Sequence, residues 1–327
     1  MTAKPFSMQK KNNIGIDLMG CETQPIEIAN AIIGLVNELP DTYQFTFFCS
    51  SDCLEGLKPP SKITIQEASE VILMSDDPLV AVRRKKDSSL CIATQMLKNG
   101  QIDALISACN TGALIAAANL FLPKLPDIDR PALLTLMPTM KHAVAILDVG
   151  ANPGAKANHL AQYAAIGIAY QKSRDIETPK VGLLNIGSEE GKGTVETREA
   201  YKLMQRFHSM FIGNIEGRDV FNGDTDVVVT DGFAGNVLLK TAEGIASFIL
   251  HEIEKDPGIS GDLDALRKRL HYAEYPGAIV AGVEGIVMKC HGDGSPTAFR
   301  ESLKATIQLL SQDFLARIKK ELELLAF

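Results

Sequence analysis

The sequence predicts an α/β fold: a doubly wound, mostly parallel sheet with helices on both faces. Short apolar runs alternate along the chain with longer segments of helical periodicity, which is typical of βαβ units. The composition, 46% hydrophobic and 22% charged, is that of an average globular chain and excludes a disordered or collagen-like one. No low-complexity linker divides the 327 residues. We therefore expect residues 1–12 to form a flexible tail and residues 13–327 a single α/β catalytic domain.

The first elements alternate between strand and helix. Asn13–Leu18 predicts a strand, and Pro25, a favoured first helical residue, opens a helix. The apolar side chains of that helix recur at helical spacing, at Ile28, Ile32, Leu35 and Leu39. Three further elements follow: strands at Gln44–Phe48 and Ile63–Ile65, and a helix at Ser88–Lys98 that the Asn99-Gly100 pair ends.

The later elements continue the same alternation. Five apolar runs predict strands at Ala104–Ile106, Leu133–Leu136, Ala143–Val149, Val181–Leu184 and Val227–Val229. Four segments of helical pattern predict helices at Asn158–Gln171, Val195–Arg206, Val237–Glu254 and Thr297–Glu321. The uncharged stretch Ala104–Leu122 is about as long as a membrane-spanning helix. Its central Asn110-Thr111-Gly112 instead favours a buried strand, loop and helix, because polar groups are costly in lipid.

Charge and cysteine content narrow the class of protein. With 33 Lys and Arg against 40 Asp and Glu, the net charge of −7 disfavours a generic nucleic-acid binder. The six cysteines form no C-x-x-C pair, and the six histidines are scattered, so we expect no metal site. The cysteines fit a reducing cytoplasm, and Met1–Lys11 has no apolar core of a signal peptide. We expect a cytoplasmic protein without a cofactor.

Four predicted strand ends share one chemistry: asparagine, glycine and small hydroxyl residues, followed by a helix. These loops are Ser107–Gly112, Asp148–Asn152, Asn185–Gly193 and Thr230–Asn236. In open α/β sheets, ligands bind outside the carboxyl ends of strands. Glycines let backbone amides approach an anion, and a helix N-terminus offers it unpaired N–H groups. Each loop taken alone is also compatible with an ordinary turn, but four together favour an anion site.

The third loop is the most informative. Gly187-x-x-x-Gly191-Lys192-Gly193 resembles a nucleotide-binding P-loop, but it is one residue short and has glycine where Ser or Thr would bind magnesium. It suits a single phosphate better than a nucleotide. The alternative for Lys192 is a solvated loop lysine. No G-x-G-x-x-G follows the first strand, and the chain has no G-x-S-x-G elbow and no H-E-x-x-H.

Two basic clusters stand out against the acidic background. Arg83-Arg84-Lys85-Lys86 precedes the helix at Ser88, and Arg267-Lys268-Arg269 lies in the amphipathic segment Leu263–Leu270. Such runs are usually solvated helix faces. The alternative is docking of an acidic partner, and Leu263–Leu270 is also a candidate for reversible, peripheral membrane contact.

Ordered motifs along the chain resemble the PlsX family, the phosphate acyltransferases of bacterial phospholipid synthesis. The matching segments are Lys85–Ser89, Ser107–Leu114, Asp129–Ala132, Asp148–Asn152, Leu183–Gly187, Gly213–Asp219, Asp231–Asn236, Gly277–Ala278 and His291–Gly292. They span nearly the whole chain. Two departures stand out. Gly20-Cys21-Glu22 replaces the family's usual two glycines and aspartate, and Cys109 replaces a usual glycine.

The resemblance implies transfer of a fatty acyl group from acyl carrier protein to inorganic phosphate, giving acyl phosphate for phospholipid synthesis. It also implies a fold related to phosphotransacetylases and isocitrate-dehydrogenase-like enzymes, and a homodimer. The product would pass to a membrane glycerol-3-phosphate acyltransferase. The two basic clusters are then candidate docking sites for the acidic carrier protein.

Such a reaction needs positioning groups and no covalent intermediate, which fits the lack of a Cys-His or Ser-His-Asp constellation. Four residues are our candidates for direct roles in catalysis: Lys192, Lys240, Asn236 and His291, the last as proton donor to the leaving thiol. Ten residues are candidates to bind or orient phosphate: Asn110, Thr111, Gly112, Asn152, Asn185, Gly187, Gly193, Asn214, Glu216 and Asp231. Each could instead be a cap or turn residue.

Three other functions remain open. A phosphotransacetylase would share the fold and use small acyl-CoA thioesters. A metal- and nicotinamide-dependent decarboxylating dehydrogenase would share it too, but would need clustered metal carboxylates and a Tyr-Lys pair, which the sequence does not display. A noncatalytic module that binds acyl carrier protein is the third, because Cys21 and Cys109 crowd loops that should approach a ligand.

Overall fold

The computed structural model describes residues 11–255, 277–291 and 294–325. Eleven strands form one sheet in the order β3-β2-β1-β4-β11-β10-β5-β6-β9-β7-β8. Their bounds are β1 Asn12–Asp17, β2 Tyr43–Cys49, β3 Ile63–Glu67, β4 Ala104–Ser107, β5 Ala132–Pro138, β6 Ala143–Leu147, β7 Val181–Leu184, β8 Phe211–Ile215, β9 Val227–Val229, β10 Ala278–Ala281 and β11 Ile286–Lys289. The predicted α/β class with a mostly parallel sheet is confirmed.

The sheet changes direction in its middle. Strands β1 to β4 and β11 pair in parallel, and so do β6, β9, β7 and β8, but the pairs β11-β10, β10-β5 and β5-β6 are antiparallel. The two parallel blocks therefore run in opposite directions. As a result, the loop after β4 and the loops after β6, β7 and β9 leave strands of opposite sense.

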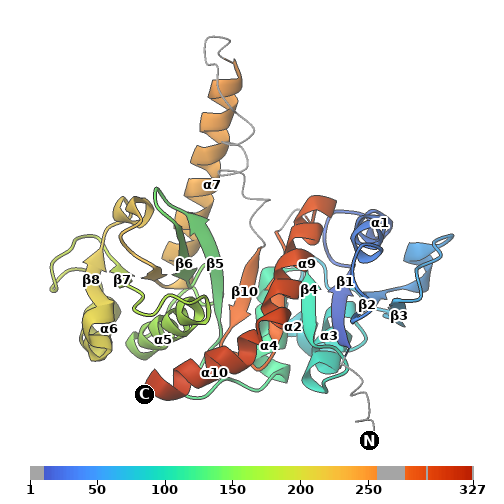
Figure 1. Ribbon diagram of the computed structural model, residues 1–327, viewed down its shortest axis with the longest axis horizontal. Helices are drawn as coiled ribbons and strands as arrows, with labels where there is room; N and C mark the ends of the chain where they lie inside the picture. Colours follow the sequence, from blue (N-terminus) through green and yellow to red (C-terminus); the bar gives the residue numbers. More distant parts are fainter. Residues whose placement is uncertain (1–10, 256–276, 292–293, 326–327) are drawn as a thin grey trace, which may run out of the picture.

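The helices cover both faces of this sheet (Figure 1). One face carries α1 Pro25–Val36, α5 Ala157–Ser173, α6 Val195–Met204, α9 Pro296–Ser311 and α10 Phe314–Leu325. The other carries α2 Pro78–Arg84, α3 Ser89–Lys98, α4 Thr111–Phe121 and α7 Gly232–Lys255. Short 3₁₀ turns lie at Ser51–Leu54 (η1), Gln205–Met210 (η2) and Asp219–Asn222 (η3).

The strands are buried on both faces, which explains their continuous apolar runs. In β6, Ala145 and Leu147 contact the core on the α5 side, whereas Val144 and Ile146 contact the core on the α4 side. Alternate residues of a strand point to opposite faces, so every residue of such a strand must be apolar. This is why short runs such as Val227–Val229 could be read directly from the sequence.

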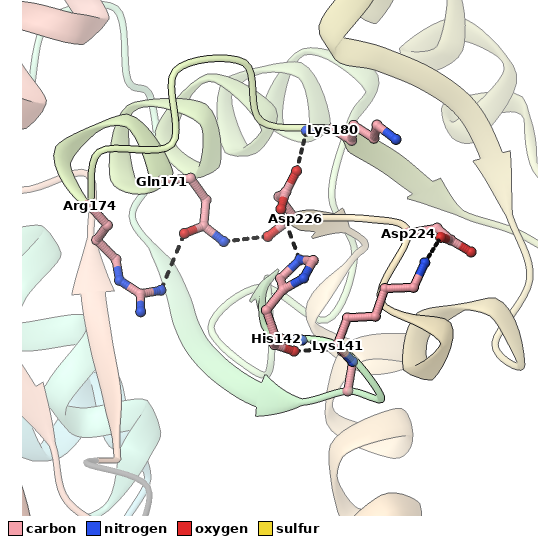
Figure 2. Close-up of polar contacts among 8 residues, drawn as sticks. Lys141, His142, Gln171, Arg174, Lys180, Asp224 and Asp226 are labelled. Atoms are coloured by element: carbon pink, nitrogen blue, oxygen red, sulfur yellow. Dashed lines mark hydrogen bonds and ion pairs between the residues drawn. The ribbon is translucent and has the colours of Figure 1, made fainter.

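A polar cluster ties together the amino-terminal ends of β6, β7 and β9 (Figure 2). The Asp226 carboxylate accepts a hydrogen bond from the backbone N–H of Lys180 at 2.7 Å and lies 2.9 Å from His142 Nε2. The Gln171 side chain of α5 donates to the Asp226 carbonyl at 2.5 Å. The cluster fixes the edge of the sheet where β6, β7 and β9 begin, while the loops that follow these three strands leave the opposite edge.

Three predicted features need correction. The single helix expected at Thr297–Glu321 is broken into α9 and α10, because Asp313 adopts a left-handed backbone with φ of 49°. The helix expected at Val237–Glu254 begins earlier, at Gly232, and the one expected at Val195–Arg206 ends at Met204 and continues as η2. Strands β8, β10 and β11 were not predicted. The expected tail at residues 1–12 lies almost wholly outside the described residues.

Candidate active site

A cavity of about 410 Å³ lies between β5, the Asn236–Ala246 part of α7 and the end of β11. In Figure 1, α7 rises beside β5 and β6 and extends beyond them. Four residues predicted from the sequence line the cavity: Thr111, Asn236, Lys240 and His291. They come from three separate parts of the chain, which the fold brings to one place.

Two helices begin at this cavity. Thr111 is the first residue of α4, and Asn236 is the fifth residue of α7. A helix N-terminus carries a partial positive charge and N–H groups without partners inside the helix, so both ends favour an anion. The Asn110 side chain caps α4 by accepting from the backbone N–H of Ala113 at 3.1 Å. Asp231 does the same for α7, accepting from Ala234 at 2.7 Å.

The loop after β6 is held by one buried carboxylate. Asp148 accepts backbone hydrogen bonds from Leu133, Gly150, Ala151 and Asn152 at 2.7–3.0 Å. The Asn152 side-chain amide donates to Asp148 at 3.0 Å and to the Pro131 carbonyl at 2.8 Å. Both amide hydrogens of Asn152 are therefore engaged within the protein. In this arrangement, Asn152 holds the loop after β6 in place and is not among the residues that line the cavity.

Helix α7 packs directly on this loop through Gly235. A Cβ atom at this position would lie 1.9 Å from the carbonyl oxygen of Asp148, so only glycine permits the approach. The side-chain amide of Asn236 donates to the Val149 carbonyl at 3.2 Å. Together these contacts fix the start of α7 against the end of β6.

A charged network runs along one side of the cavity. Lys240 Nζ donates to Glu243 Oε2 at 2.8 Å, and His291 Nε2 lies 3.6 Å from Glu243 Oε1. Burial alone would raise the pKa of Glu243, but its contacts with His291 and Lys240 outweigh burial and lower it. Glu243 thus stays ionised between a lysine and a histidine, which orients both toward the cavity.

Lys289, at the end of β11, lines the cavity and is nearly fully buried. Its ammonium group donates to the carbonyls of Cys290 at 2.6 Å and Ala108 at 3.3 Å. Burial lowers the pKa of Lys289, while the nearby thiols of Cys109, Cys290 and Cys21 act in the opposite direction. Cys109 directly follows Ala108, whose carbonyl accepts from this lysine.

A buried carboxylate lies in the same region. Asp17, at the end of β1, accepts from Ser107 Oγ at 2.8 Å and from the backbone N–H of Met19 at 3.1 Å. Burial raises the pKa of Asp17 to about 6, against the opposing effects of its hydrogen bonds and Lys289. Burial also raises the pKa of the Cys109 thiol to about 12, so this thiol is protonated at neutral pH and is a poor nucleophile.

The residues predicted after β7 form a second group, which does not line the cavity. The side chain of Asn185 folds its own loop, donating to the Lys192 carbonyl at 3.1 Å and accepting from Ile186 at 2.9 Å. The half-exposed Lys192 Nζ lies 3.8 Å from Glu189. Gly193 needs its left-handed backbone, with φ of +91°. Gly187 lies in the same loop, against Glu189 and Lys192.

Two further candidates, on and just after β8, adjoin this second group. Asn214 is buried in β8 and donates to the Glu189 carbonyl at 2.8 Å. Glu216 lies 3.4 Å from Arg218. Because β7 lies between β9 and β8, the loop after β7 neighbours the start of α7, which follows β9, along the same edge of the sheet.

Two residues near α4 have structural roles in this conformation. The Asn110 amide donates to the carbonyls of Met74 at 3.0 Å and Asp76 at 3.4 Å. Gly112 makes room for the ring of Pro78, which would lie 2.7 Å from a Cβ atom there. These contacts attach α2 and the segment before it to α4. The sequence pattern at Asn110 and Gly112 therefore reflects helix packing and capping.

The first basic cluster is only partly available for docking. Arg83, Arg84 and Lys86 are exposed. Lys85 is instead tied down by Asp76 at 2.5 Å and by the Val71 carbonyl at 2.8 Å, so it holds a loop. Lys86 also lies over the Phe121 ring at 5.1 Å. The second cluster, Arg267, Lys268 and Arg269, and the segment Leu263–Leu270 lie outside the described residues.

Sequence reasoning missed Glu243, Lys289 and Gly150 as cavity residues. Lys289 could have been suspected, because a lysine at the end of an apolar run is hard to leave unpaired. Glu243 gave no such signal. In the sequence, Glu243 resembles an ordinary solvated charge on a helix. Its position beside His291, just after β11, is what indicates a role in orienting that histidine.

Within the ranges the structure describes, no group of three or more His, Cys, Asp or Glu residues is arranged to hold a metal ion. In the same ranges, one helix, α7, is long and apolar enough to cross a membrane by length and composition. Only 6% of its most apolar 18-residue stretch is buried. Part of its exposed surface is apolar, at Phe233, Val237, Ile245, Phe248 and Ile249.

Comparison with known proteins gives a consistent set of relatives. Residues 12–317 match a family described as "Fatty acid synthesis protein". A phosphate acyltransferase of Exiguobacterium sp. is 40% identical over 325 residues, covering 94% of this chain and 98% of the relative. A phosphate acyltransferase of Desulfitobacterium hafniense (strain Y51) is 40% identical over 326 residues, covering 94% and 97%.

Solved structures share the fold at low sequence identity. A phosphotransacetylase from Streptococcus pyogenes superimposes with a TM-score of 0.62 at 16% identity, covering 92% of this chain and 94% of the other. A 4-hydroxythreonine-4-phosphate dehydrogenase from Klebsiella pneumoniae gives a TM-score of 0.53 at 13% identity, covering 91% and 99%. These likenesses confirm the predicted relation to the phosphotransacetylase fold.

Proposed function

Because the chain belongs to the PlsX family of phosphate acyltransferases, we propose that it transfers a fatty acyl group from acyl carrier protein to inorganic phosphate. The acyl phosphate formed would supply phospholipid synthesis. The observation that carries this proposal is the cavity, where helix N-termini and lysines adjoin an apolar surface. That pairing suits a reaction between a phosphate anion and a lipid thioester.

The reaction proceeds by direct attack. A phosphate oxygen forms a bond to the thioester carbonyl carbon, and the carbon–sulfur bond then breaks. The leaving thiolate takes a proton and departs as the carrier-bound thiol. Holding both reactants in line can supply about 7–11 kcal/mol of the barrier. The enzyme then needs an anion site, donors for the developing oxyanion and a proton source, but no nucleophile of its own.

The cavity residues fit these three roles. The N-terminus of α4 with Thr111, and the side-chain amide of Asn236, offer donors to phosphate and to the oxyanion. Lys240 and Lys289 supply positive charge on the same side of the cavity. His291, oriented by Glu243, donates the proton to the thiolate. Lys192 does not line the cavity in this conformation, so its proposed part in offsetting the phosphate charge requires the loop after β7 to move toward the cavity.

The exposed arginines of α2 are the proposed docking site for the acidic carrier protein. Helix α2 packs on α4, whose first residue lines the cavity. Arg83 and Arg84 lie about 8 Å further along α2 than Pro78, which touches the start of α4. A carrier held there by charge would have its thioester within reach of the site.

Charge reversal tests this docking site. We expect the Arg83→Glu/Arg84→Glu variant to raise the KM for acyl carrier protein about tenfold or more, and to weaken the salt dependence of the rate. Its kcat should change little. Lys98→Glu, at the exposed end of α3, is the matched control. An unchanged KM in the α2 variant would assign these arginines to a solvated face.

The exposed apolar side of α7 supports a homodimer, because a second copy of the chain would cover Phe233, Val237 and Phe248. We further propose a cytoplasmic protein with peripheral membrane contact, which would pass acyl phosphate to a membrane glycerol-3-phosphate acyltransferase. Sedimentation equilibrium and co-sedimentation with vesicles measure these two properties separately.

The enzyme assay separates this function from its closest alternative. Purified protein is incubated with phosphate and either palmitoyl-acyl carrier protein or acetyl-CoA, and acyl phosphate is trapped with hydroxylamine. We expect product from the carrier-bound palmitoyl group and little from acetyl-CoA. The reverse preference would identify a phosphotransacetylase, whose fold this chain shares. Binding of the carrier without any product would identify a noncatalytic module.

A further inference from the structure

The cavity has two chemically different walls. A helix turns by 100° per residue, so Asn236, Lys240 and Glu243 project from one stripe of α7. This stripe faces Lys289 and His291 and forms the polar wall. The neighbouring stripe of the same helix carries Leu239, Ala242 and Ala246, which also line the cavity.

The second wall is apolar along its length. Leu239 and Ala242 pack against the hydrophobic core on this face of the sheet, together with Phe221 of η3. Across from them, Leu133 and Met137 of β5 belong to the same core. Apolar residues at this wall have no role in binding phosphate, carrier protein or the proton donor. Their arrangement instead suits a hydrocarbon.

The apolar wall is elongated and has two distinguishable ends. The near end lies at Leu133 and Asn236. Val149 links these two residues, because its backbone N–H donates to the Leu133 carbonyl and its carbonyl accepts from the Asn236 amide. The far end lies at Pro138 and Phe221, since the Phe221 carbonyl accepts from the turn that follows β5. From Leu133 to Pro138, β5 spans about 17 Å. From Asn236 to Ala246, α7 spans about 15 Å.

The volume of the cavity matches a fatty acyl chain. A methylene group is similar in size to a water molecule, whose share of liquid volume is about 30 Å³. On the order of a dozen methylene groups would fill the cavity of about 410 Å³, and because phosphate takes part of this space, the cavity holds part of a long acyl chain. An acetyl group would leave most of this apolar space empty, at a cost in binding.

We propose that the acyl chain lies along this apolar wall, and that Ala242 of α7 and Phe221 of η3 set the length of chain accepted. This inference rests on the proposed function and assigns a subsite within the same cavity. Ala242 leaves room beside the chain, because its side chain is small and lies between Leu239 and Ala246 along the wall. Phe221 closes the far end, so its ring limits how far the chain extends.

Two variants with opposite effects test the subsite. In Ala242→Leu, three added carbons displace part of the chain, and each methylene lost from burial lowers kcat/KM about fourfold. We expect the ratio of kcat/KM for palmitoyl over hexanoyl donors to fall at least about tenfold. In Phe221→Ala, the ring is removed and the ratio of stearoyl over palmitoyl donors should rise, by about fourfold per methylene newly accommodated. All donors are presented on acyl carrier protein.

The matched control is Thr241→Leu, the adjacent exposed position on α7. It should leave both ratios unchanged. If either cavity variant is too unstable to purify, the other still decides, because each shifts its own ratio in a predicted direction. Chain-length ratios in Ala242→Leu and Phe221→Ala equal to those of the parent enzyme would overturn the subsite. Failure of the parent enzyme to make acyl phosphate from any donor would instead overturn the proposed function.

Discussion

Replacing Asp148 by asparagine should unfold the protein more readily than almost any other single polar change. The Asp148 carboxylate is fully buried and accepts five hydrogen bonds, four from backbone N–H groups and one from the Asn152 amide. In Asp148→Asn, one oxygen can keep its three partners. The new NH₂ group must face the backbone and side-chain N–H groups of Asn152, where it cannot accept.

The cost follows from these contacts. Hydrogen bonds to a charged group contribute about 1.5–3 kcal/mol each, so losing two predicts a loss of about 3–6 kcal/mol in the free energy of unfolding. This is a large part of the 5–15 kcal/mol that typically stabilises a domain. Because Gly235 packs on the Asp148 carbonyl, the start of α7 should loosen as well, and kcat/KM should fall.

Urea unfolding followed by circular dichroism, at one protein concentration and pH 7, measures this change. Asp52→Asn, an exposed carboxylate of η1, is the control and should alter the free energy of unfolding by no more than about 0.5 kcal/mol. A loss below about 1 kcal/mol in Asp148→Asn would refute the assigned role of the carboxylate, because the five hydrogen bonds would then contribute almost nothing.

Three other variants address the site. If the loop after β7 closes on phosphate as proposed, Lys192→Ala should raise the KM for phosphate about tenfold or more with acyl carrier protein saturating, because a charge-assisted contact would be lost. Lys202→Ala on α6 is the control and should leave this KM unchanged. Equal phosphate KM values would make Lys192 a solvated lysine. Glu243→Gln should lower kcat about tenfold in the parent enzyme but not in a His291→Ala background, and additive effects in this double-mutant cycle would separate the two residues. Asp17→Asn tests the pH dependence of stability. In the folded protein the pKa of Asp17 is raised from 3.8 to about 6, so its protonated form favours folding. This contribution is fully present below pH 3.8 and is lost as the pH rises through 6. The stability difference between Asp17→Asn and the parent should therefore change by about 2 kcal/mol in favour of the variant between pH 4 and 7, and a constant difference would contradict the burial of an acidic group there.

The sequence was most informative where structure depends on neighbours along the chain. The bounds of β7 and β9 match the predicted Val181–Leu184 and Val227–Val229, because a strand buried on both faces must be apolar throughout. The break at Asp313 was missed because no glycine or proline marks it. The short strands β10 and β11, with glycines around them, resemble loops.

The reversal of direction at β5 and β10 could not be predicted at all. Strand direction depends on how distant segments pair, and the sequence of a short apolar run does not indicate which strand it pairs with or in which direction. This affects the site directly. Thr111 and Gly150 both line the cavity although they follow strands of opposite sense. A prediction that assumes one common edge for all strand ends would not explain their meeting.

The candidate site was predicted in its residue types more than in its arrangement. Thr111, Asn236, Lys240 and His291 reach the cavity. Thr111, Asn236 and His291 lie near a strand end or a helix start, whereas Lys240 lies inside α7. Asn152 and Asn110 carry the same local signal, but their amides are used within the protein. A glycine- and asparagine-rich loop therefore identifies a region of interest, while tertiary contacts decide which side chains remain available to a ligand.

The most direct test of the account is a comparison of rates of acyl phosphate formation from palmitoyl-acyl carrier protein and from acetyl-CoA. Both reactions use the same enzyme preparation at limiting phosphate. We expect a much higher kcat/KM for the carrier-bound long chain, because docking on α2 and the apolar wall of the cavity both favour it. Equal or greater kcat/KM with acetyl-CoA would contradict the account, since neither feature would then contribute to catalysis.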